Sequence, residues 1–439
     1  MRAVLCLFSF AALLFSQPLP LSTPEKEGFS SQRLETLHKR FEEFVEKGTR
    51  AGAITMILHN GKIVDWKTYG YRDVDRKLPM EKDTICRIWS MTKPITSVAV
   101  MMLVEEGRLT LSDPVGNYVP ELKEMHVLKG GDADHPKVAD AVRPITIKNL
   151  LTHTSGLTYT WGQDPVSELN RREKIFEVAN LKEFAGKVGR IPLIADPGEK
   201  YNYSIGIDVL GYVVEVVSGM PFDKFVQTRI LTPLRMNETY WNVPEEKLSR
   251  VAKTYGYKDG KLSETSMPEI TSLAKVPFGG MGLYSTIGDY ARFAQMLING
   301  GELDGARLLG RKTVELMTTV NHLNGLHVPF IDEDGAYGFG LGGSVRMDLA
   351  KGNIPGSLGQ FGWDGAASTY FRIDPKEDAV ALLFQQYMPF DKPNLELFST
   401  LVYQAMAEPA GVTSKPAFEE SAGRLRSQGS IAPSQRTGK

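Results

Sequence analysis

The chain has 439 residues, of which 42% are hydrophobic and 23% charged, a composition typical of a folded globular protein large enough for two lobes around a substantial core. Its 51 basic and 52 acidic residues give a formal net charge of −1. This balance gives no reason to expect nucleic acid or an anionic membrane as a partner. We therefore expect a small-molecule partner.

The first residues have the pattern of a secretory signal peptide. A basic start at Arg2 precedes the apolar run 3–15, and polar residues follow from Ser16. The run is too short to span a membrane, so we expect residues 1–16 to be removed and the protein to be secreted or periplasmic. Leu14 and Ser16 stand where a cleavage site prefers small residues, which leaves a retained anchor as the alternative.

Cysteine usage excludes two kinds of stabilisation. Removal of the signal peptide takes Cys6 with it and leaves Cys86 as the remaining cysteine, so an internal disulfide is not expected. The chain has no Cys/His cluster of zinc-binding type, and we predict neither a metal nor another cofactor.

The first predicted elements form a helix and a hairpin. Residues 31–47 have amphipathic helical spacing, and residues 52–58 and 62–69 alternate as strands on either side of Asn60-Gly61. Asn-Gly between two such runs is a strong hairpin signal. An antiparallel sheet is expected to begin here.

The segment Ile88-Trp89-Ser90-Met91-Thr92-Lys93-Pro94 precedes an apolar run and contains the candidate nucleophile. We predict that Ser90 caps a helix over 91–106, where the positive end of the helix dipole favours an oxyanion. Lys93 lies one turn further along the same face and can accept the serine proton if burial lowers its pKa. This spacing suits acyl transfer, whereas the alternative is a capping serine and a solvated lysine.

Residues 114–276 read as mostly helical and loop-like. Within them Thr152-His153-Thr154-Ser155-Gly156 is interpreted as a helix end closed by Gly156, with His153 and Ser155 bonding backbone groups rather than forming a triad. Ser204 is predicted to cap a helix that runs to about Ser218. Tyr203 then projects from the loop before that helix, a position where a tyrosine is more often a packing residue.

The last third returns to strands. Thr286 and Asp289 predict a capping box for a helix over 287–297, and residues 361–371 and 379–385 read as two adjacent core strands joined at Asp374-Pro375. From 406 to 439 the chain is polar and rich in Ser, Pro, Gly and Arg, and we predict a disordered tail.

Three segments, in this order, resemble motifs of the serine β-lactamase-like hydrolases, specifically class C β-lactamases and family VIII esterases. They are Ser90-Met91-Thr92-Lys93, Tyr203-Ser204 with Asp208-Val209-Leu210-Gly211, and Trp363-Asp364-Gly365. The resemblance covers about residues 22–405. The chain has no Gly-x-Ser-x-Gly elbow, which argues against an α/β-hydrolase.

The resemblance implies an α+β fold of the β-lactamase/penicillin-binding-protein type. An antiparallel sheet flanked by helices would come from about 22–113 and 277–405, a mostly helical lobe from about 114–276, and the site would lie in the cleft between them. By the same resemblance Ser90 is the nucleophile, and Lys93 and Tyr203 move protons, with Tyr201 as the second candidate.

The remaining site residues follow from the third motif and from one position at which the sequence differs from class C β-lactamases. The backbone amides of Ser90 and Ala366 would form the oxyanion hole, and Gly365 would allow close backbone approach. Trp363 stands where β-lactamases carry the lysine of Lys-Thr-Gly, and Ile205 stands where class C β-lactamases carry an asparagine. Trp363 and Ile205 would offer apolar surface to the substrate, and Asp364 would repel a carboxylate.

We therefore expect a serine hydrolase that acts on short-chain carboxylic esters through an acyl-enzyme. The alternatives on the same site are a β-lactamase, a D-amino-acid peptidase or an acyltransferase. A catalytically silent binding protein on the same fold is the alternative outside enzymes.

Overall fold

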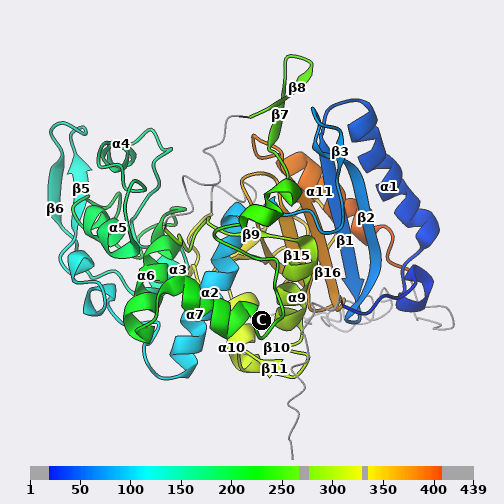
Figure 1. The fold of residues 1–439 in the computed structure, drawn as a ribbon. Coiled ribbons are helices and arrows are strands. Elements are labelled where there is room, and N and C mark those ends of the chain that lie inside the picture. The colour runs from blue at the N-terminus through cyan, green and yellow to red at the C-terminus, as the bar shows by residue number, and fades with distance from the viewer. Residues whose placement is uncertain (1–18, 266–275, 329–334, 408–439) are drawn as a thin grey trace, which may run out of the picture.

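The computed structural model describes residues 19–265, 276–328 and 335–407 (Figure 1). The predicted signal peptide at 1–16, with Cys6, and the predicted tail from residue 408 onward lie outside the described residues. Among the helices that are described, none is long and apolar enough to cross a membrane.

An eight-stranded sheet joins the two ends of the chain. Its order is β12-β13-β14-β15-β16-β1-β2-β3, and every neighbouring pair is antiparallel. The strands are β1 Gly52–His59, β2 Lys62–Asp73, β3 Leu78–Pro79, β12 Tyr337–Phe339, β13 Ser344–Arg346, β14 Phe361–Asp364, β15 Tyr370–Asp374 and β16 Ala379–Gln385. The N-terminal β1 pairs with the C-terminal β16 from Ala53↔Gln385 to His59↔Ala379, so neither end can complete the sheet alone.

Alternation along the central strands gives the sheet two buried faces. On β16, Leu382 and Phe384 belong to the larger core cluster, whereas Ala381 and Leu383 point to a second cluster on the opposite face. The helices α1 (Ser31–Glu46) and α11 (Lys392–Tyr403) cover that second face. Helix α9 (Ile287–Ile298) packs on β15 and β16 from the side of the larger cluster.

Helix α2 (Thr92–Glu105) runs between the sheet and a separate group of helices (Figure 1). Every residue from Thr92 to Leu103 is buried, because α6 and α7 cover the side that faces away from the sheet. A helix that is buried on all sides has no solvent face, so the position of α2 is fixed by both groups.

The middle of the chain forms that helical group, at the left of Figure 1. Its elements are α3 Ile147–Leu151, α4 Pro165–Arg172, α5 Leu181–Val188, α6 Gly206–Ser218, α7 Phe222–Val226 and a π-helical turn Gln227–Leu231, with a hairpin of β5 His126–Gly130 and β6 Lys137–Asp140. A second hairpin, β7 Tyr255–Lys258 and β8 Lys261–Glu264, lies beside the sheet, since Tyr255 bridges to Tyr387. Part of the stretch predicted as the helical lobe therefore accompanies the sheet.

Short elements complete the described chain. They are the 3₁₀ turns Pro24–Glu27, Trp89–Met91, Val115–Asn117, Pro120–Leu122 and Glu245–Arg250, the strands β4 Cys86–Arg87, β9 Tyr284–Ser285, β10 Glu302–Leu303 and β11 Ala306–Arg307, and helix α10 Arg311–Thr318.

The predicted first helix, the hairpin around Asn60-Gly61 and the helix after Thr286 are confirmed. The prediction of two strands joined at Asp374-Pro375 is incomplete, because three strands occupy 361–385. The missed turn lies at 365–369, where Gly365 donates its amide hydrogen to Thr369 and Ser368 adopts a φ of +61°. A serine in the left-handed region gives no strong turn signal in a sequence.

Candidate active site

Ser90 lies in a tight turn just before α2. The prediction that it caps a helix starting at Met91 is wrong in detail, because Trp89–Met91 forms a 3₁₀ turn and α2 begins at Thr92. Trp89 has a φ of +46°, a region that L-residues with bulky side chains rarely adopt. This conformation puts the side chains of Trp89 and Ser90 in different cavities.

Lys93 is completely buried at the first turn of α2. Its Nζ lies 3.2 Å from Ser90 Oγ, 3.0 Å from Tyr159 Oη and 2.8 Å from the carbonyl oxygen of Gly280. A neutral amine has two N–H donors and one lone pair. The donors fit Tyr159 and Gly280, which leaves the lone pair for the hydroxyl of Ser90.

Burial is the largest influence on the ionisation of Lys93. Removal of the ammonium from water lowers the pKa of Lys93, and the nearby carboxylate of Asp208 opposes part of that effect. The result is an amine whose neutral form is populated at a lower pH than that of an exposed lysine. A neutral amine beside a serine hydroxyl can accept its proton.

Asp208 on α6 lies behind Lys93 and is also fully buried. Its carboxylate accepts the amide hydrogen of Gly280 at 2.8 Å and the phenol of Tyr159 at 3.4 Å. Gly280 thus bonds Lys93 through its carbonyl and Asp208 through its amide. A Cβ at Gly280 would fall 2.8 Å from the carboxyl carbon of Asp208, so a glycine is needed there.

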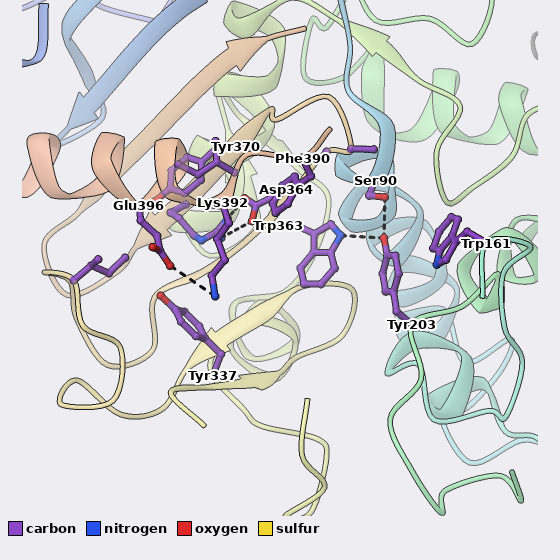
Figure 2. Close-up of a pocket in the computed structure, with 15 residues that line it drawn as sticks. Ser90, Trp161, Tyr203, Tyr337, Trp363, Asp364, Tyr370, Phe390, Lys392 and Glu396 are labelled. Atoms are coloured by element: carbon purple, nitrogen blue, oxygen red, sulfur yellow. Dashed lines mark hydrogen bonds and ion pairs between the residues drawn. The ribbon is translucent and has the colours of Figure 1, made fainter. Parts of the chain in front are cut away.

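Tyr203 approaches Ser90 from the helical group (Figure 2). Its hydroxyl lies 2.8 Å from Ser90 Oγ and accepts the indole N–H of Trp363 at 3.3 Å. Burial raises the pKa of Tyr203, so the phenol keeps its proton near neutral pH. Tyr201 is also buried, but its hydroxyl has no hydrogen-bond partner among the described residues. The geometry favours Tyr203 over Tyr201.

His153 helps to hold Tyr203 in place. The imidazole is fully buried with a φ of +55°, and its Nδ1 accepts the amide hydrogen of Ser204 at 3.2 Å. The ring also packs at 4.6 Å between centroids from the ring of Tyr203. Burial and the charge of Lys93 lower the pKa of His153, which keeps it neutral. It bonds a backbone group, as predicted, and does not form a triad with Ser155.

Two backbone amides at or near Ser90 are available to a ligand. The amides of Ser90 and Ala366 have no hydrogen-bond acceptor in the described part of the chain, and both residues line the cavity. Gly365 makes this arrangement possible, because a Cβ there would lie 2.5 Å from the carbonyl oxygen of Ile88 and would also meet the hydroxyl of Thr369. Gly365, just after β14, thus lets the chain approach the serine turn closely, and it also lines the cavity, where its predicted close approach to a substrate stays a prediction.

A cavity of about 330 Å³ opens from Ser90 between the helical group and the sheet (Figure 2). Its walls are mainly aromatic and aliphatic: Trp161, Tyr203, Tyr337, Ile354, Trp363, Tyr370, Phe390 and Leu395. Trp161 is 59% exposed and stacks on Tyr159 at 3.9 Å between centroids. Sites of this size and character bind small, largely apolar molecules through a few polar groups.

Two expectations about this cavity are wrong. Asp364 lines the cavity but accepts two hydrogen bonds from the guanidinium of Arg372, at 2.7 and 2.9 Å. Its negative charge is therefore balanced and does not repel a carboxylate as expected. Ile205 is 1% exposed at the start of α6 and packs in the core, so it does not offer a surface to the substrate.

Three residues that contact Lys93 or its neighbours were not predicted as site residues, although Asp208 stands in the second motif. Tyr159, Asp208 and Gly280 come from segments that are far from Lys93 in sequence. Asp208 carried a usable signal, since it is a charged residue inside the apolar run Ile207–Leu210. Tyr159 and Gly280 gave no local sign of their partners.

The sheet and the helical group, with Ser90, Lys93 and Tyr203 meeting at their junction, define the β-lactamase and penicillin-binding-protein class of folds. The chain belongs to the beta-lactamase family, whose family model matches residues 37–401. It is 36% identical to Protein Rv1367c of Mycobacterium tuberculosis over 79% of this chain and 88% of that protein.

Other relatives have names that describe activities. Acyltransferase mokF of Monascus pilosus is 30% identical over 76% of this chain and 87% of its own length, and Esterase EstB of Burkholderia gladioli is 27% identical over 76% and 85%. The solved structure of unliganded Simvastatin Synthase (LovD) from Aspergillus terreus superimposes with a TM-score of 0.74 at 25% identity, covering 85% of this chain and 98% of that one. These relatives support a hydrolase or acyltransferase.

The close contact at Gly365 predicts the effect of a single added methyl group. Gly365→Ala should lower the free energy of unfolding by about 1–3 kcal/mol, because the Cβ overpacks against the Ile88 carbonyl. Gly186→Ala in α5, where a Cβ meets nothing within 4 Å, is the matched control and should not destabilise. Chemical denaturation measures both. Equal stabilities of the two variants would contradict the packing described here.

Proposed function

We propose that this protein is a serine carboxylesterase that forms an acyl-enzyme on Ser90. The observation that supports this most strongly is a row of hydrogen bonds that ends at Lys93. The Trp363 indole N–H donates to Tyr203 Oη, and the Tyr203 phenol donates to Ser90 Oγ. The Ser90 hydroxyl lies 3.2 Å from Lys93 Nζ and can donate to it when the amine is neutral. The two unbonded amides beside it complete the requirements for acyl transfer.

Acylation starts when Lys93 Nζ accepts the hydroxyl proton of Ser90 as Oγ bonds to the ester carbonyl carbon. The carbonyl oxygen becomes negative and lies against the amides of Ser90 and Ala366. Collapse of this intermediate breaks the bond to the alcohol oxygen, which needs a proton. Tyr203 donates its phenol proton to that oxygen. The Lys93 ammonium, whose Nζ lies 4.6 Å from the centroid of the Tyr203 ring, then gives its proton to the phenolate, so that both groups regain their starting protonation.

Deacylation repeats these steps with water in place of Ser90. Lys93 and Tyr203 take a proton from the attacking water, and the oxyanion forms again at the amides of Ser90 and Ala366. The carboxylic acid then leaves as Ser90 Oγ regains its proton. If an alcohol occupies the place of water, the acyl group passes to that alcohol. The named activity of mokF makes acyl transfer the second candidate, and the exposed, stacked Trp161 at the cavity offers a surface for such an alcohol.

Neutral short-chain esters are the proposed substrates. The cavity offers apolar walls to an acyl group, and its Asp364–Arg372 pair is already neutralised. An activated ester also has a better leaving group than an amide, so its cleavage depends less on protonation of that leaving group. Trp363 supplies an N–H to Tyr203 where the β-lactamase motif has a lysine to meet a substrate carboxylate.

Replacement of the nucleophile is the first test. Ser90→Ala should reduce hydrolysis of a short-chain nitrophenyl ester by roughly 10⁴–10⁶-fold while the fold is kept. The wild type should gain the mass of one acyl group during turnover, and the variant should not. Ser97→Ala is the matched control, because Ser97 is a buried serine two turns further along α2 with no hydrogen-bond partner of its hydroxyl among the described residues. Full activity in folded Ser90→Ala would contradict the assignment.

The two tyrosines provide a matched pair for the proton path. Tyr203→Phe should slow turnover by roughly 10²–10⁴-fold, whereas Tyr201→Phe should have little effect, since its hydroxyl contacts nothing polar in the described structure. Combining Tyr203→Phe with Lys93→Ala should cost less than the product of the single losses, because both serve one path. Steady-state kcat/KM values decide this. The reverse ranking of the two tyrosines would exclude Tyr203.

Substrate preference tests the role of the third motif. The kcat/KM for nitrophenyl butyrate should exceed that for a chromogenic cephalosporin. Trp363→Lys should raise the kcat/KM for the cephalosporin, because the new ammonium can pair with the cephalosporin carboxylate. Asp364→Lys should instead destabilise the protein by about 3 kcal/mol, because it leaves Arg372 without its partner. A wild-type preference for the cephalosporin would refute the proposed specificity.

A further inference from the structure

A second cavity of about 410 Å³ lies next to the turn that carries Ser90. Ser90 lines the first cavity, whereas its neighbours Trp89 and Arg87 line the second. Other parts of its wall come from β2, from the segment 248–254 and from the end of β8. The second cavity shares no lining residue with the first.

Arg87 is the unusual residue of this second cavity. Only 6% of this residue is exposed, yet it forms no ion pair with a carboxylate of the described residues, and its side-chain partner is the phenol of Tyr284. The guanidinium stacks 3.5 Å above the ring of Trp89 and bonds the phenol of Tyr284, which is neutral, while its Nε–H has no partner. Arginine keeps its charge in proteins, and a buried charge without a counterion is costly.

Arg76 also lines the cavity, but it is exposed to solvent, and the other charged groups around the cavity are paired. Lys253 pairs with Glu264 at 2.8 Å and with Asp73 at 3.5 Å. Arg72 pairs with Glu81 at 2.6 Å. Arg87 is therefore a buried cation in a cavity whose other buried charges are already paired, and the stacking on Trp89 offsets only part of its desolvation.

We propose that this second cavity binds a small monovalent carboxylate anion through the guanidinium of Arg87. A carboxylate matches the planar fork of a guanidinium with two parallel hydrogen bonds, and one negative charge balances one buried cation. Asp73 and Glu264 in the same wall disfavour an anion of higher charge. The inference does not depend on the esterase proposal, because Arg87 makes none of the contacts of Lys93 or Tyr203.

Nuclear magnetic resonance on the full, ¹⁵N-labelled protein tests this directly. Sodium acetate is the probe, and sodium chloride at the same ionic strength is the control. The Nε–H resonance of Arg87, assigned through its own backbone, should shift and saturate with millimolar acetate and should not respond to chloride. The exposed Arg311 on α10 provides an internal control, and its Nε–H resonance should not shift with acetate concentration as that of Arg87 does.

A variant gives an independent readout. Acetate should raise the melting temperature of the wild type more than chloride does, and Arg87→Lys should lose that difference because an ammonium cannot bind a carboxylate with a planar fork. If Arg87→Lys fails to fold, the resonance of the wild type still decides. An Arg87 resonance that ignores acetate, or that responds equally to chloride, would overturn the proposal.

Discussion

The burial of the Lys93 ammonium is the constraint on which the rest of the site depends. An exposed lysine is charged at neutral pH and cannot accept the proton of a serine. Lys93 is surrounded instead by Ser90, Tyr159 and the carbonyl of Gly280, a set that suits two donors and one lone pair. Asp208 lies close enough to moderate the loss of hydration, so that burial is tolerated without a direct ion pair in the described structure.

The fold produces this burial by placing α2 between two separately built groups. The sheet needs both ends of the chain, because β1 pairs with β16, while the helices that cover the other side of α2 come from the middle. Lys93 is therefore enclosed only when both groups are in place. The contacts of Lys93 reflect this, since Tyr159 comes from the helical group and Gly280 from the segment just before β9. Asp208 on α6 in turn bonds the amide of Gly280. Ser90 escapes burial because the 3₁₀ turn at Trp89 directs it into the cavity.

Short sequence patterns predicted those helices and strands whose ends are set by interactions between residues close in sequence. The hairpin at Asn60-Gly61 and the helix begun by Thr286 follow from turn and capping chemistry, and the structure has both. The three motifs also placed Ser90, Lys93 and Tyr203, which meet within hydrogen-bond distance. Contacts between distant segments were not predictable. Arg372 neutralises Asp364 from the adjacent strand, and Ile205 turns into the core, because cross-strand register and helix rotation are set by packing.

The central claim is that Lys93 is a neutral base, and its ionisation can be measured without any substrate. In protein labelled with ¹³C at the lysine ε-carbon, the signal of Lys93, identified by its loss in Lys93→Ala, should titrate at a pH well below the ordinary lysine value of 10.5. The sign follows from burial, which disfavours the charged form. A Lys93 that stays protonated up to the pH at which the exposed lysines titrate would contradict this account.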